Sequence, residues 1–302
     1  MRAMPARVAI VEVGPRDGLQ NEAALVSTAS KIAFVDRLSA AGHSTIEVSA
    51  FVSPKRVPQM ADASEVFLGI ERRAGVRYTA LVPNLAGLDR AMAAGVSEIA
   101  IFAAASETFS QRNIHQSIEQ SLITYAAVCR SAEAAGLRVR GYLSTCFGCP
   151  FEGTVPAARV GDLSARLIDL GVFEVAVSDT IGVAHPGQVL IVLEAVTARV
   201  PLDRVALHFH DTRGTALANV LAALDYGVTT FDSSSGGLGG CPFAPGAAGN
   251  LATEDLLYML DGLGVETGLS LDSIVSASRF IESRIDHALP SRYVQAVRAS
   301  AQ

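Results

Sequence analysis

Val205-Ala206-Leu207-His208-Phe209-His210-Asp211 is an apolar run that ends in polar residues. In a β-strand successive side chains alternate between two faces, so His208 and His210 point to the same side. Neutral imidazole is the commonest protein metal ligand, and two imidazoles placed in this way favour a metal site. The alternative is two unrelated polar residues at a strand end, and an isolated His-x-His motif does not decide between them.

Apolar, β-rich segments of this kind recur along the chain and alternate with alanine- and leucine-rich segments of helical periodicity. Strands are predicted at residues 8–13, 45–48, 76–82, 98–102, 138–143, 173–177, 204–209 and 228–231. Helices are predicted at residues 31–41, 157–170, 188–199 and 215–226, among others. Strands that alternate with helices form βαβ units and a parallel sheet. Eight such strands predict an α/β fold of the (β/α)₈ TIM-barrel type.

An open, doubly wound sheet is the alternative, but it would carry a glycine fingerprint after the first strand. The segment Val11-Glu12-Val13-Gly14-Pro15-Arg16-Asp17-Gly18 is not such a fingerprint. No linker-like composition divides the 302 residues. We therefore predict one catalytic domain over residues 1–302, with a barrel core at about 8–235 and a glycine-rich lid loop and C-terminal elaboration at about 236–302.

Composition narrows the function classes. A net charge of −6 and the lack of a Lys/Arg block argue against a nucleic-acid partner. No apolar stretch approaches the length of a membrane span, and the N-terminus lacks a signal-peptide core. Four irregularly spaced cysteines predict reduced thiols in the cytoplasm rather than a disulfide framework. Lys31 and Lys55 are the only lysines, and this arginine- and alanine-rich composition is typical of a bacterial, GC-rich genome.

Charged residues fall where predicted strands end, and in a barrel the loops at the carboxyl ends of the strands form the active face. Arg16 and Asp17 follow the first strand, Glu47 closes the second, and Asp179 follows the sixth. Asp179 and Asp211 could alternatively cap the next helix. Several charges gathered at one end of a barrel favour an active site over solvated surface.

Two cysteine-bearing segments differ in their surroundings. Ser235-Gly236-Gly237-Leu238-Gly239-Gly240-Cys241-Pro242-Phe243 is rich in glycine, which permits mobility or positive φ, as an active-site lid requires. Cys241 lies within it, and a buried structural thiol is the alternative there. Cys146-Phe147-Gly148-Cys149 is a lone C-x-x-C, which without a second pair indicates loop packing rather than zinc.

Together these motifs resemble a known family. They are Val11 to Glu22 (VEVGPRDGLQNE), Ser53-Pro54-Lys55, Asp179-Thr180-Ile181-Gly182, His208 to Thr212 (HFHDT), Gly239 to Ala244 (GGCPFA) and Gly249 to Asp255 (GNLATED). From about residue 8 to 285 the chain resembles the 3-hydroxy-3-methylglutaryl-CoA lyases. The wider superfamily of barrel metallolyases shares the arginine–aspartate pair and the His-x-His motif, and it includes isopropylmalate and homocitrate synthases.

The resemblance implies a divalent-metal site. Asp17, His208, His210 and Asn250 stand at the positions of the family's ligands for a divalent cation, usually Mg²⁺ or Mn²⁺. One carboxylate, two imidazoles and an amide oxygen leave coordination positions for substrate oxygens. The imidazoles make this set softer than an all-oxygen site, so Co²⁺ should serve as well.

The resemblance also implies the reaction, a retro-Claisen cleavage of 3-hydroxy-3-methylglutaryl-CoA or a close 3-hydroxyacyl-CoA to acetyl-CoA and acetoacetate. Arg16 looks like the residue that steadies the enolate. Glu47 and Asp179 occupy positions of metal-site support and proton transfer, and Cys241 that of a lid cysteine. The base for the hydroxyl proton is His208 or Asp179, with Cys241 a partner in protonating the enolate carbon. An acyl-CoA is the expected partner, and a homodimer is possible.

The sequence departs from the family pattern near the acyl site. Ala23 replaces a lysine and Ser178 a glycine, and residues 48–50 are less polar than usual. The exact acyl-CoA, the physiological metal and the oligomeric state therefore stay open. Two other functions are compatible with the barrel. A condensing acyltransferase would share the metal ligands but usually has a longer C-terminal region, and a non-catalytic barrel would have its ligands broken.

Overall fold

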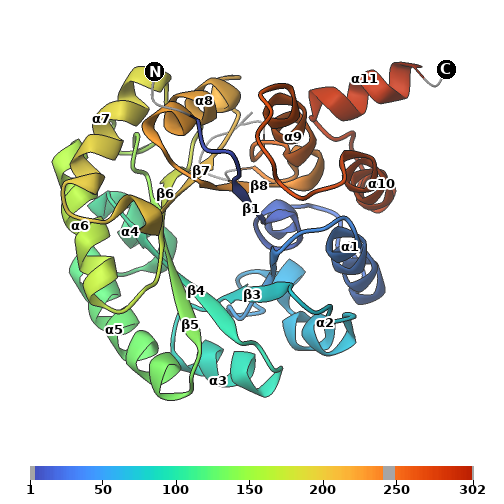
Figure 1. The fold of residues 1–302 in the computed structure, drawn as a ribbon. Coiled ribbons are helices and arrows are strands. Elements are labelled where there is room, and N and C mark those ends of the chain that lie inside the picture. Colours follow the sequence, from blue (N-terminus) through green and yellow to red (C-terminus); the bar gives the residue numbers. More distant parts are fainter. Residues whose placement is uncertain (1–3, 241–248, 301–302) are drawn as a thin grey trace.

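Eight parallel strands form a closed barrel in the order β1 to β8, with β8 hydrogen-bonded to β1 (Figure 1). The computed structural model describes residues 4–240 and 249–300. The strands are β1 (Ala9–Glu12), β2 (Thr45–Ala50), β3 (Arg77–Leu81), β4 (Glu98–Ala104), β5 (Arg138–Ser144), β6 (Val175–Asp179), β7 (Val205–Phe209) and β8 (Thr230–Ser233). The predicted TIM barrel is confirmed.

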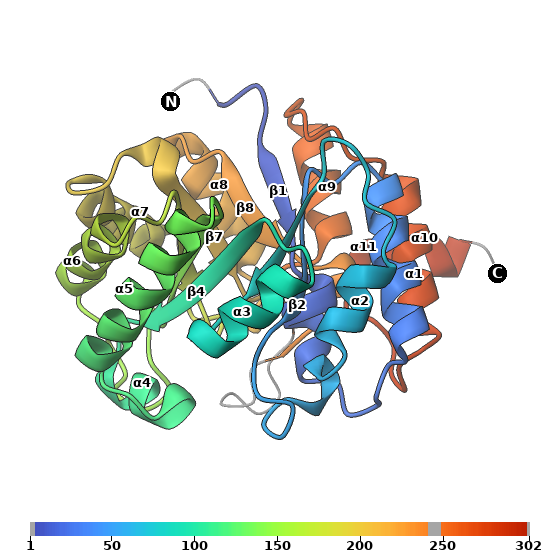
Figure 2. The same cartoon turned by 90° about the horizontal axis from the view of Figure 1, so that it is seen from below.

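Helices surround the strands in both views of the molecule (Figures 1 and 2). They are α1 (Thr28–Ala40), α2 (Ala63–Gly69), α3 (Leu85–Ala93), α4 (Glu107–Ile114), α5 (Ile118–Ala134), α6 (Ala157–Asp169), α7 (Pro186–Thr197), α8 (Ala216–Tyr226), α9 (Thr253–Gly262), α10 (Leu271–Glu282) and α11 (Arg292–Ser300). None of the described helices is long and apolar enough to cross a membrane.

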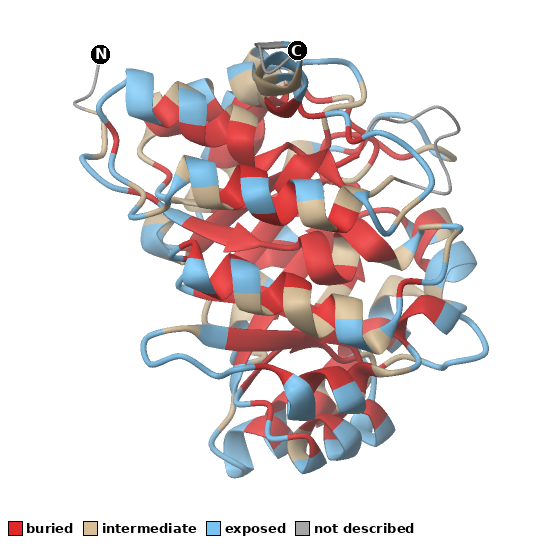
Figure 3. Cartoon of the chain, turned by 90° about the vertical axis from the view of Figure 1, so that its right-hand side faces the viewer, coloured by how far each residue is buried: buried red, intermediate tan, exposed pale blue. Residues whose placement is uncertain are grey.

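Burial explains why these segments become strands and helices. Every residue of β2 and of β7 is buried, whereas the helices carry both buried and exposed residues (Figure 3). The strands of a parallel barrel are buried because helices cover the outer face and side chains fill the inner one. Local signals start the helices: the Ser27 hydroxyl accepts from Ser30 N at α1, and a capping box of Ser117 and Gln120 begins α5.

The second strand is longer than predicted. It runs to Ala50 because Ser49 and Ala50 stay paired with β3 beyond a bulge that follows Glu47. Glu47 therefore lies inside β2, and the prediction that it closes the strand was wrong. The predicted strand ended at Val48, whereas the next two residues, Ser49 and Ala50, are also buried in β2.

The C-terminal helices pack on one side of the barrel. Helix α10 lies against α1 and α9, and α11 against α9 (Figures 1 and 2). The segment before β1 pairs with the loop after α9, since Val8 N donates to Glu266 O at 3.0 Å. The predicted elaboration after about residue 236 is thus helical and begins directly after β8.

Candidate active site

A pocket of about 750 Å³ opens at the carboxyl ends of the strands, and we call it the barrel-end pocket. Its polar lining residues include Arg16, Asp17, His208 and His210. Its apolar lining residues include Leu81, Phe102, Phe109 and Tyr125. The predicted active face of the barrel is therefore a cavity with polar and apolar walls, as small-molecule sites usually are.

Three potential metal ligands meet in this pocket. Asp17 belongs to the π-helical turn Gly14–Gly18 (η1) after β1, while His208 lies in β7 and His210 directly follows that strand. The Nε2 atoms of His208 and His210 lie 4.0 and 3.8 Å from Asp17 Oδ2. One donor atom from each residue falls within a mutual distance of 4.8 Å. The fold thus brings the His-x-His motif next to an aspartate that lies at least 191 positions earlier in the chain.

Asn250 joins the same cluster through the backbone. It forms an isolated bridge with His210, and its Nδ2 donates to Asp17 Oδ2 and to Leu238 O, both at 3.0 Å. Its Oδ1 is buried and has no hydrogen-bond partner within the described chain. The same is true of His210 Nδ1. Buried polar atoms without partners are rare and indicate a place for an ion or a water. The donor set of carboxylate, imidazoles and amide oxygen therefore fits a divalent cation.

The charge states of these groups suit metal binding. Burial alone would raise the pKa of Asp17, but Arg16, His208 and His210 lower it far below its usual range. Burial, together with the neighbouring His208, lowers the pKa of His210 to about 4. At neutral pH Asp17 is an anion and His210 is a neutral imidazole. Both are in the form that a metal ligand requires.

Arg16 is fixed beside this cluster. Its Nε donates to Glu47 Oε2 and its Nη1 to Asp17 Oδ1, both at 2.6 Å. The guanidinium carbon lies 5.5 Å from the centre of the Tyr142 ring. Burial would lower the pKa of Arg16, but the two carboxylates raise it, so the group stays cationic. A permanent cation is therefore held in place next to the metal ligands.

The two predicted acidic residues after β6 and β7 have backbone partners. Asp179 is buried at the end of β6, and its carboxylate accepts from Val183 N at 3.0 Å and Ala184 N at 2.9 Å. Burial raises the pKa of Asp179 despite these bonds. Asp211 Oδ1 accepts from Ala216 N, the first residue of α8, at 2.9 Å. Neither aspartate is the N-cap of the helix that follows it, because His185 is the N-cap of α7 and Thr215 that of α8, so the capping alternative was wrong.

Cys241 lies outside the described residues. The glycines before it are described, and the positive φ expected of them is present at Gly236 (69°), Gly237 (74°) and Gly239 (113°). A Cβ on Gly239 would lie 2.6 Å from Asn250 Nδ2, so glycine is required for this close approach. Gly240 lines the barrel-end pocket, and its carbonyl accepts from Asn21 Nδ2 at 2.8 Å.

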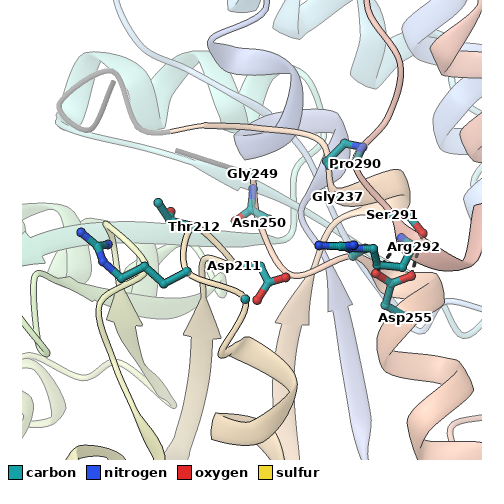
Figure 4. Close-up of a pocket in the computed structure, with 12 residues that line it drawn as sticks. Asp211, Thr212, Gly237, Gly249, Asn250, Asp255, Pro290, Ser291 and Arg292 are labelled. Carbon is teal, nitrogen blue, oxygen red and sulfur yellow. Dashed lines mark hydrogen bonds between the residues drawn. The ribbon is translucent and has the colours of Figure 1, made fainter. Parts of the chain in front are cut away.

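A second cavity, of about 370 Å³, is lined by Asn250 and by two glycines, Gly237 and Gly249 (Figure 4). On its wall the Asp255 carboxylate accepts from Ser291 Oγ at 2.8 Å and Arg292 N at 3.0 Å. These bonds attach the start of α11 to α9. The C-terminal elaboration is thereby held close to the segment that carries Asn250.

Sequence reasoning missed two buried carboxylates near the site. Asp232 Oδ2 lies 3.3 Å from His208 Nδ1. Glu12 accepts from Gly14 N, Ser235 N, Ser235 Oγ and Thr253 Oγ1 at 2.8–2.9 Å, and burial raises its pKa to about 7. The only signal in the sequence is an acidic residue inside an apolar strand. That signal is clear for Glu12, whereas Asp232 lay one residue beyond the predicted end of its strand.

The remaining cysteines and the sequence departures are now placed. Cys146 and Cys149 are buried free thiols, and Cys146 Sγ donates a hydrogen bond to Leu143 O at 2.9 Å. Both observations agree with the predicted loop packing. Among the departures, Ser178 lines the barrel-end pocket, whereas Ala23 is exposed. Residues 48–50 are buried in β2 and are not part of the pocket lining.

Comparisons with known proteins agree with this geometry. The HMGL-like family matches residues 7–281. The chain is 49% identical to the hydroxymethylglutaryl-CoA lyase YngG of Bacillus subtilis over 296 residues, which covers 98% of this chain and 99% of that protein. A crystal structure of hydroxymethylglutaryl-CoA lyase from Pseudomonas aeruginosa matches with a TM-score of 0.97 and 50% identity, covering 98% and 99% of the two chains. An HMG-CoA lyase from Acinetobacter baumannii in complex with coenzyme A and 3-methylmalate matches with a TM-score of 0.93 and 39% identity, covering 98% and 97%.

Proposed function

Because the chain belongs to the hydroxymethylglutaryl-CoA lyase family, we propose that its barrel-end pocket cleaves 3-hydroxy-3-methylglutaryl-CoA to acetyl-CoA and acetoacetate. The protein is a carbon–carbon lyase of this type. The observation that carries the assignment is the meeting of Asp17, His208 and His210 beside Arg16 at the carboxyl end of the barrel. That arrangement places a cluster of metal ligands beside a fixed cation, and this reaction needs both.

The reaction sets definite chemical demands. The proton of the tertiary hydroxyl leaves, the hydroxyl carbon becomes the ketone of acetoacetate, and the bond to the neighbouring carbon breaks. The electron pair of that bond passes to the thioester, which becomes an enolate. A proton then returns to carbon and gives acetyl-CoA. A base, a stabiliser of the enolate charge and a proton donor are therefore required.

Asp17, His208, His210 and Asn250 would hold the divalent cation, with Mg²⁺ or Mn²⁺ the proposed ions. A bound divalent cation supplies Lewis-acid polarisation of substrate oxygens and lowers the pKa of a hydroxyl group. The protein's own contribution is to keep Asp17 ionised and His210 neutral before the ion arrives.

Arg16 is proposed to stabilise the enolate. Its two hydrogen bonds to Glu47 and Asp17 fix the guanidinium before substrate binds, so little reorganisation is needed when negative charge develops. Glu47 is the positioning residue in this account, since its Oε2 accepts from Arg16 Nε. Its Oε1 is buried and has no hydrogen-bond partner within the described chain.

The base is Asp179 or His208, and Asp179 is the one tested first. Both nitrogens of His208 already face carboxylates, Nδ1 that of Asp232 and Nε2 that of Asp17 in the ligand cluster. Burial raises the pKa of Asp179, which makes its carboxylate a stronger base. Asp179→Asn should then lower kcat while Mn²⁺ affinity is retained. If kcat of Asp179→Asn stays within about tenfold of the wild-type value, His208 is the base instead.

Cys241 is proposed to return the proton to the enolate carbon. Gly240, the preceding residue, lines the barrel-end pocket, which supports a place for the thiol in the reaction. The glycine-rich segment is proposed as the lid that excludes water from the enolate. An acyl-CoA is the substrate class, in keeping with the coenzyme A complex of the Acinetobacter lyase. A homodimer and a cytoplasmic location remain expectations.

The test is incubation of purified protein with 3-hydroxy-3-methylglutaryl-CoA and Mn²⁺, with acetyl-CoA and acetoacetate quantified separately. A parallel incubation with acetyl-CoA and a 2-oxo acid tests the condensing alternative. Formation of both cleavage products in equal amounts supports the lyase. Release of free coenzyme A in the second incubation alone would instead indicate an acyltransferase. Because Ser178 is the one departure that lines the pocket, longer 3-hydroxyacyl-CoA substrates belong in the same assay.

A further inference from the structure

We infer that Asp232 is a positioning residue that selects the tautomer of His208 and so presents Nε2 as a metal ligand. The two residues are direct neighbours across the β7–β8 pairing, so both side chains point into the barrel. Asp232 Oδ2 lies 3.3 Å from His208 Nδ1. Asp232 is 1% exposed and His208 6% exposed. The inference rests on the metal site of the proposed function and adds a residue outside its ligand set.

The charge state of Asp232 decides which atom donates. Arg140 binds it through two parallel bonds, Nη2 to Oδ1 at 2.8 Å and Nη1 to Oδ2 at 3.1 Å. This two-bond pairing with a buried guanidinium holds Asp232 as a carboxylate. An ionised carboxylate has only acceptor atoms. His208 Nδ1 must therefore carry the hydrogen, and in a neutral ring Nε2 then keeps its lone pair.

The carboxylate is also held rigidly. Arg140 comes from β5, across the barrel from β8, and it is 4% exposed. Its Nε donates to Glu174 Oε1 at 2.8 Å and its Nη1 to the Tyr142 hydroxyl at 3.0 Å. Four bonds thus fix the guanidinium, and the guanidinium fixes Asp232. The imidazole plane of His208 is oriented by a group that cannot turn away.

This arrangement distinguishes the two histidines. Nε2 of His208, the nitrogen left with a lone pair, is the atom that faces Asp17 Oδ2 at 4.0 Å. His210 has no comparable partner within the described chain, since its Nδ1 is buried and unpaired. A carboxylate behind a metal-binding histidine typically contributes 10- to 100-fold to metal affinity. We assign that contribution to Asp232.

The discriminating experiment compares Asp232→Asn with Glu174→Gln by titrating each purified, metal-free variant with Mn²⁺ and following free Mn²⁺ by electron paramagnetic resonance. Each variant removes one of the two carboxylate charges that face Arg140. If Asp232 only neutralised that cation, the two variants would behave alike. An asparagine can present its amide N–H₂ to Nδ1 and so favour the wrong tautomer. We expect Asp232→Asn to weaken Mn²⁺ binding by about 10- to 100-fold and Glu174→Gln to change it less than about threefold.

Equal Mn²⁺ affinities in the wild type and Asp232→Asn, or equal losses in the two variants, would overturn the inference. A wild type that binds no Mn²⁺ would overturn the metal site as well, so the two failures are distinguishable. A measurement on the wild type covers the case in which Asp232→Asn does not fold. Nitrogen-15 spectra of the metal-free protein should show His208 protonated at Nδ1 and not at Nε2. Protonation at Nε2 alone would refute the assignment.

Discussion

Arg16 Nε lies 2.6 Å from Glu47 Oε2, and the two residues are buried side chains from segments 31 positions apart in the chain. This bond, with the second bond from Arg16 to Asp17, turns a long and flexible side chain into a fixed cation. The position of the guanidinium therefore depends on its planar geometry as well as on its charge. An ammonium group could not satisfy both carboxylates with the same two-sided arrangement.

Arg16→Lys should therefore lower kcat by roughly 10²- to 10³-fold, the usual cost of losing a preorganised donor to developing negative charge. Arg56→Lys is the matched control, because Arg56 lines the same pocket but is exposed. It should leave kcat nearly unchanged. Steady-state kinetics of both variants checks the prediction. A fall of less than about tenfold for Arg16→Lys would make Arg16 a structural residue only.

His210→Ala should abolish Mn²⁺ binding and most activity while leaving the barrel folded. The His210 side chain lines the barrel-end pocket, and its Nδ1 makes no hydrogen bond within the described chain that the fold would lose. Circular dichroism and Mn²⁺ titration of the variant check the two halves of this prediction. Full turnover of His210→Ala after exhaustive chelation would contradict the metal assignment.

Alkylation should inactivate the enzyme through Cys241, and bound substrate or product should slow the inactivation. The other three cysteines are buried. Burial raises the pKa of the Cys129 thiol to about 11 and raises that of Cys146 further, so few reactive thiolates form there. Mass spectrometry after partial inactivation with iodoacetamide identifies the modified residue. Cys241→Ser should lower kcat and leave Mn²⁺ affinity unchanged.

Modification of Cys146 or Cys149 in step with the loss of activity would contradict this role for Cys241. A fully active Cys241→Ser enzyme would do the same. Cys129→Ser is the control, because its side chain belongs to α5, outside the pocket lining, and it should neither protect the enzyme nor change kcat.

Glu254 should make stability depend on pH. It is buried, accepts from Gly236 N at 2.8 Å, and burial raises its pKa from 4.5 to about 7. A carboxyl whose pKa is raised on folding contributes stability that is fully present below about pH 4.5 and lost as the pH rises through about 7. Glu254→Gln stays neutral, so its stability relative to the wild type should increase by up to about 3 kcal/mol between about pH 5 and pH 8.

Urea unfolding of the wild type and Glu254→Gln at the two pH values checks this expectation. The comparison cancels every titrating group that the two proteins share. Asp272→Asn at an exposed site serves as the control and should show no pH-dependent difference. A constant difference between Glu254→Gln and the wild type would mean that Glu254 titrates normally in the folded protein.

The barrel and the two histidine ligands could be predicted from the sequence because each depends on local patterns, whereas Asp17 and Asn250 were identified as ligands through the family resemblance. Apolar strands such as β7 and the His-x-His motif at its end can be read from a few neighbouring residues. The lyase family was identified from motifs that are likewise short. The loop-packing interpretation of the C-x-x-C segment followed from the lack of a second cysteine pair, and both thiols are buried.

Residues that act across the barrel could not be predicted in this way. Asp232 matters because β8 aligns it with His208 and because Arg140 reaches it from β5, and neither relationship is local. Glu47 was placed at a strand end because continued pairing beyond a bulge leaves no mark in the sequence. The backbone bonds of Asp179 depend on the turn after β6, whose path follows from tertiary packing.

The most direct test of the account is a cleavage assay with 3-hydroxy-3-methylglutaryl-CoA before and after removal of divalent metal. We predict acetyl-CoA and acetoacetate in a one-to-one ratio with Mn²⁺, no turnover after chelation, and recovery when Mn²⁺ is added back. Cleavage that persists undiminished in the chelated enzyme, or a metal-loaded enzyme that leaves this thioester and its longer 3-hydroxyacyl analogues intact, would contradict it.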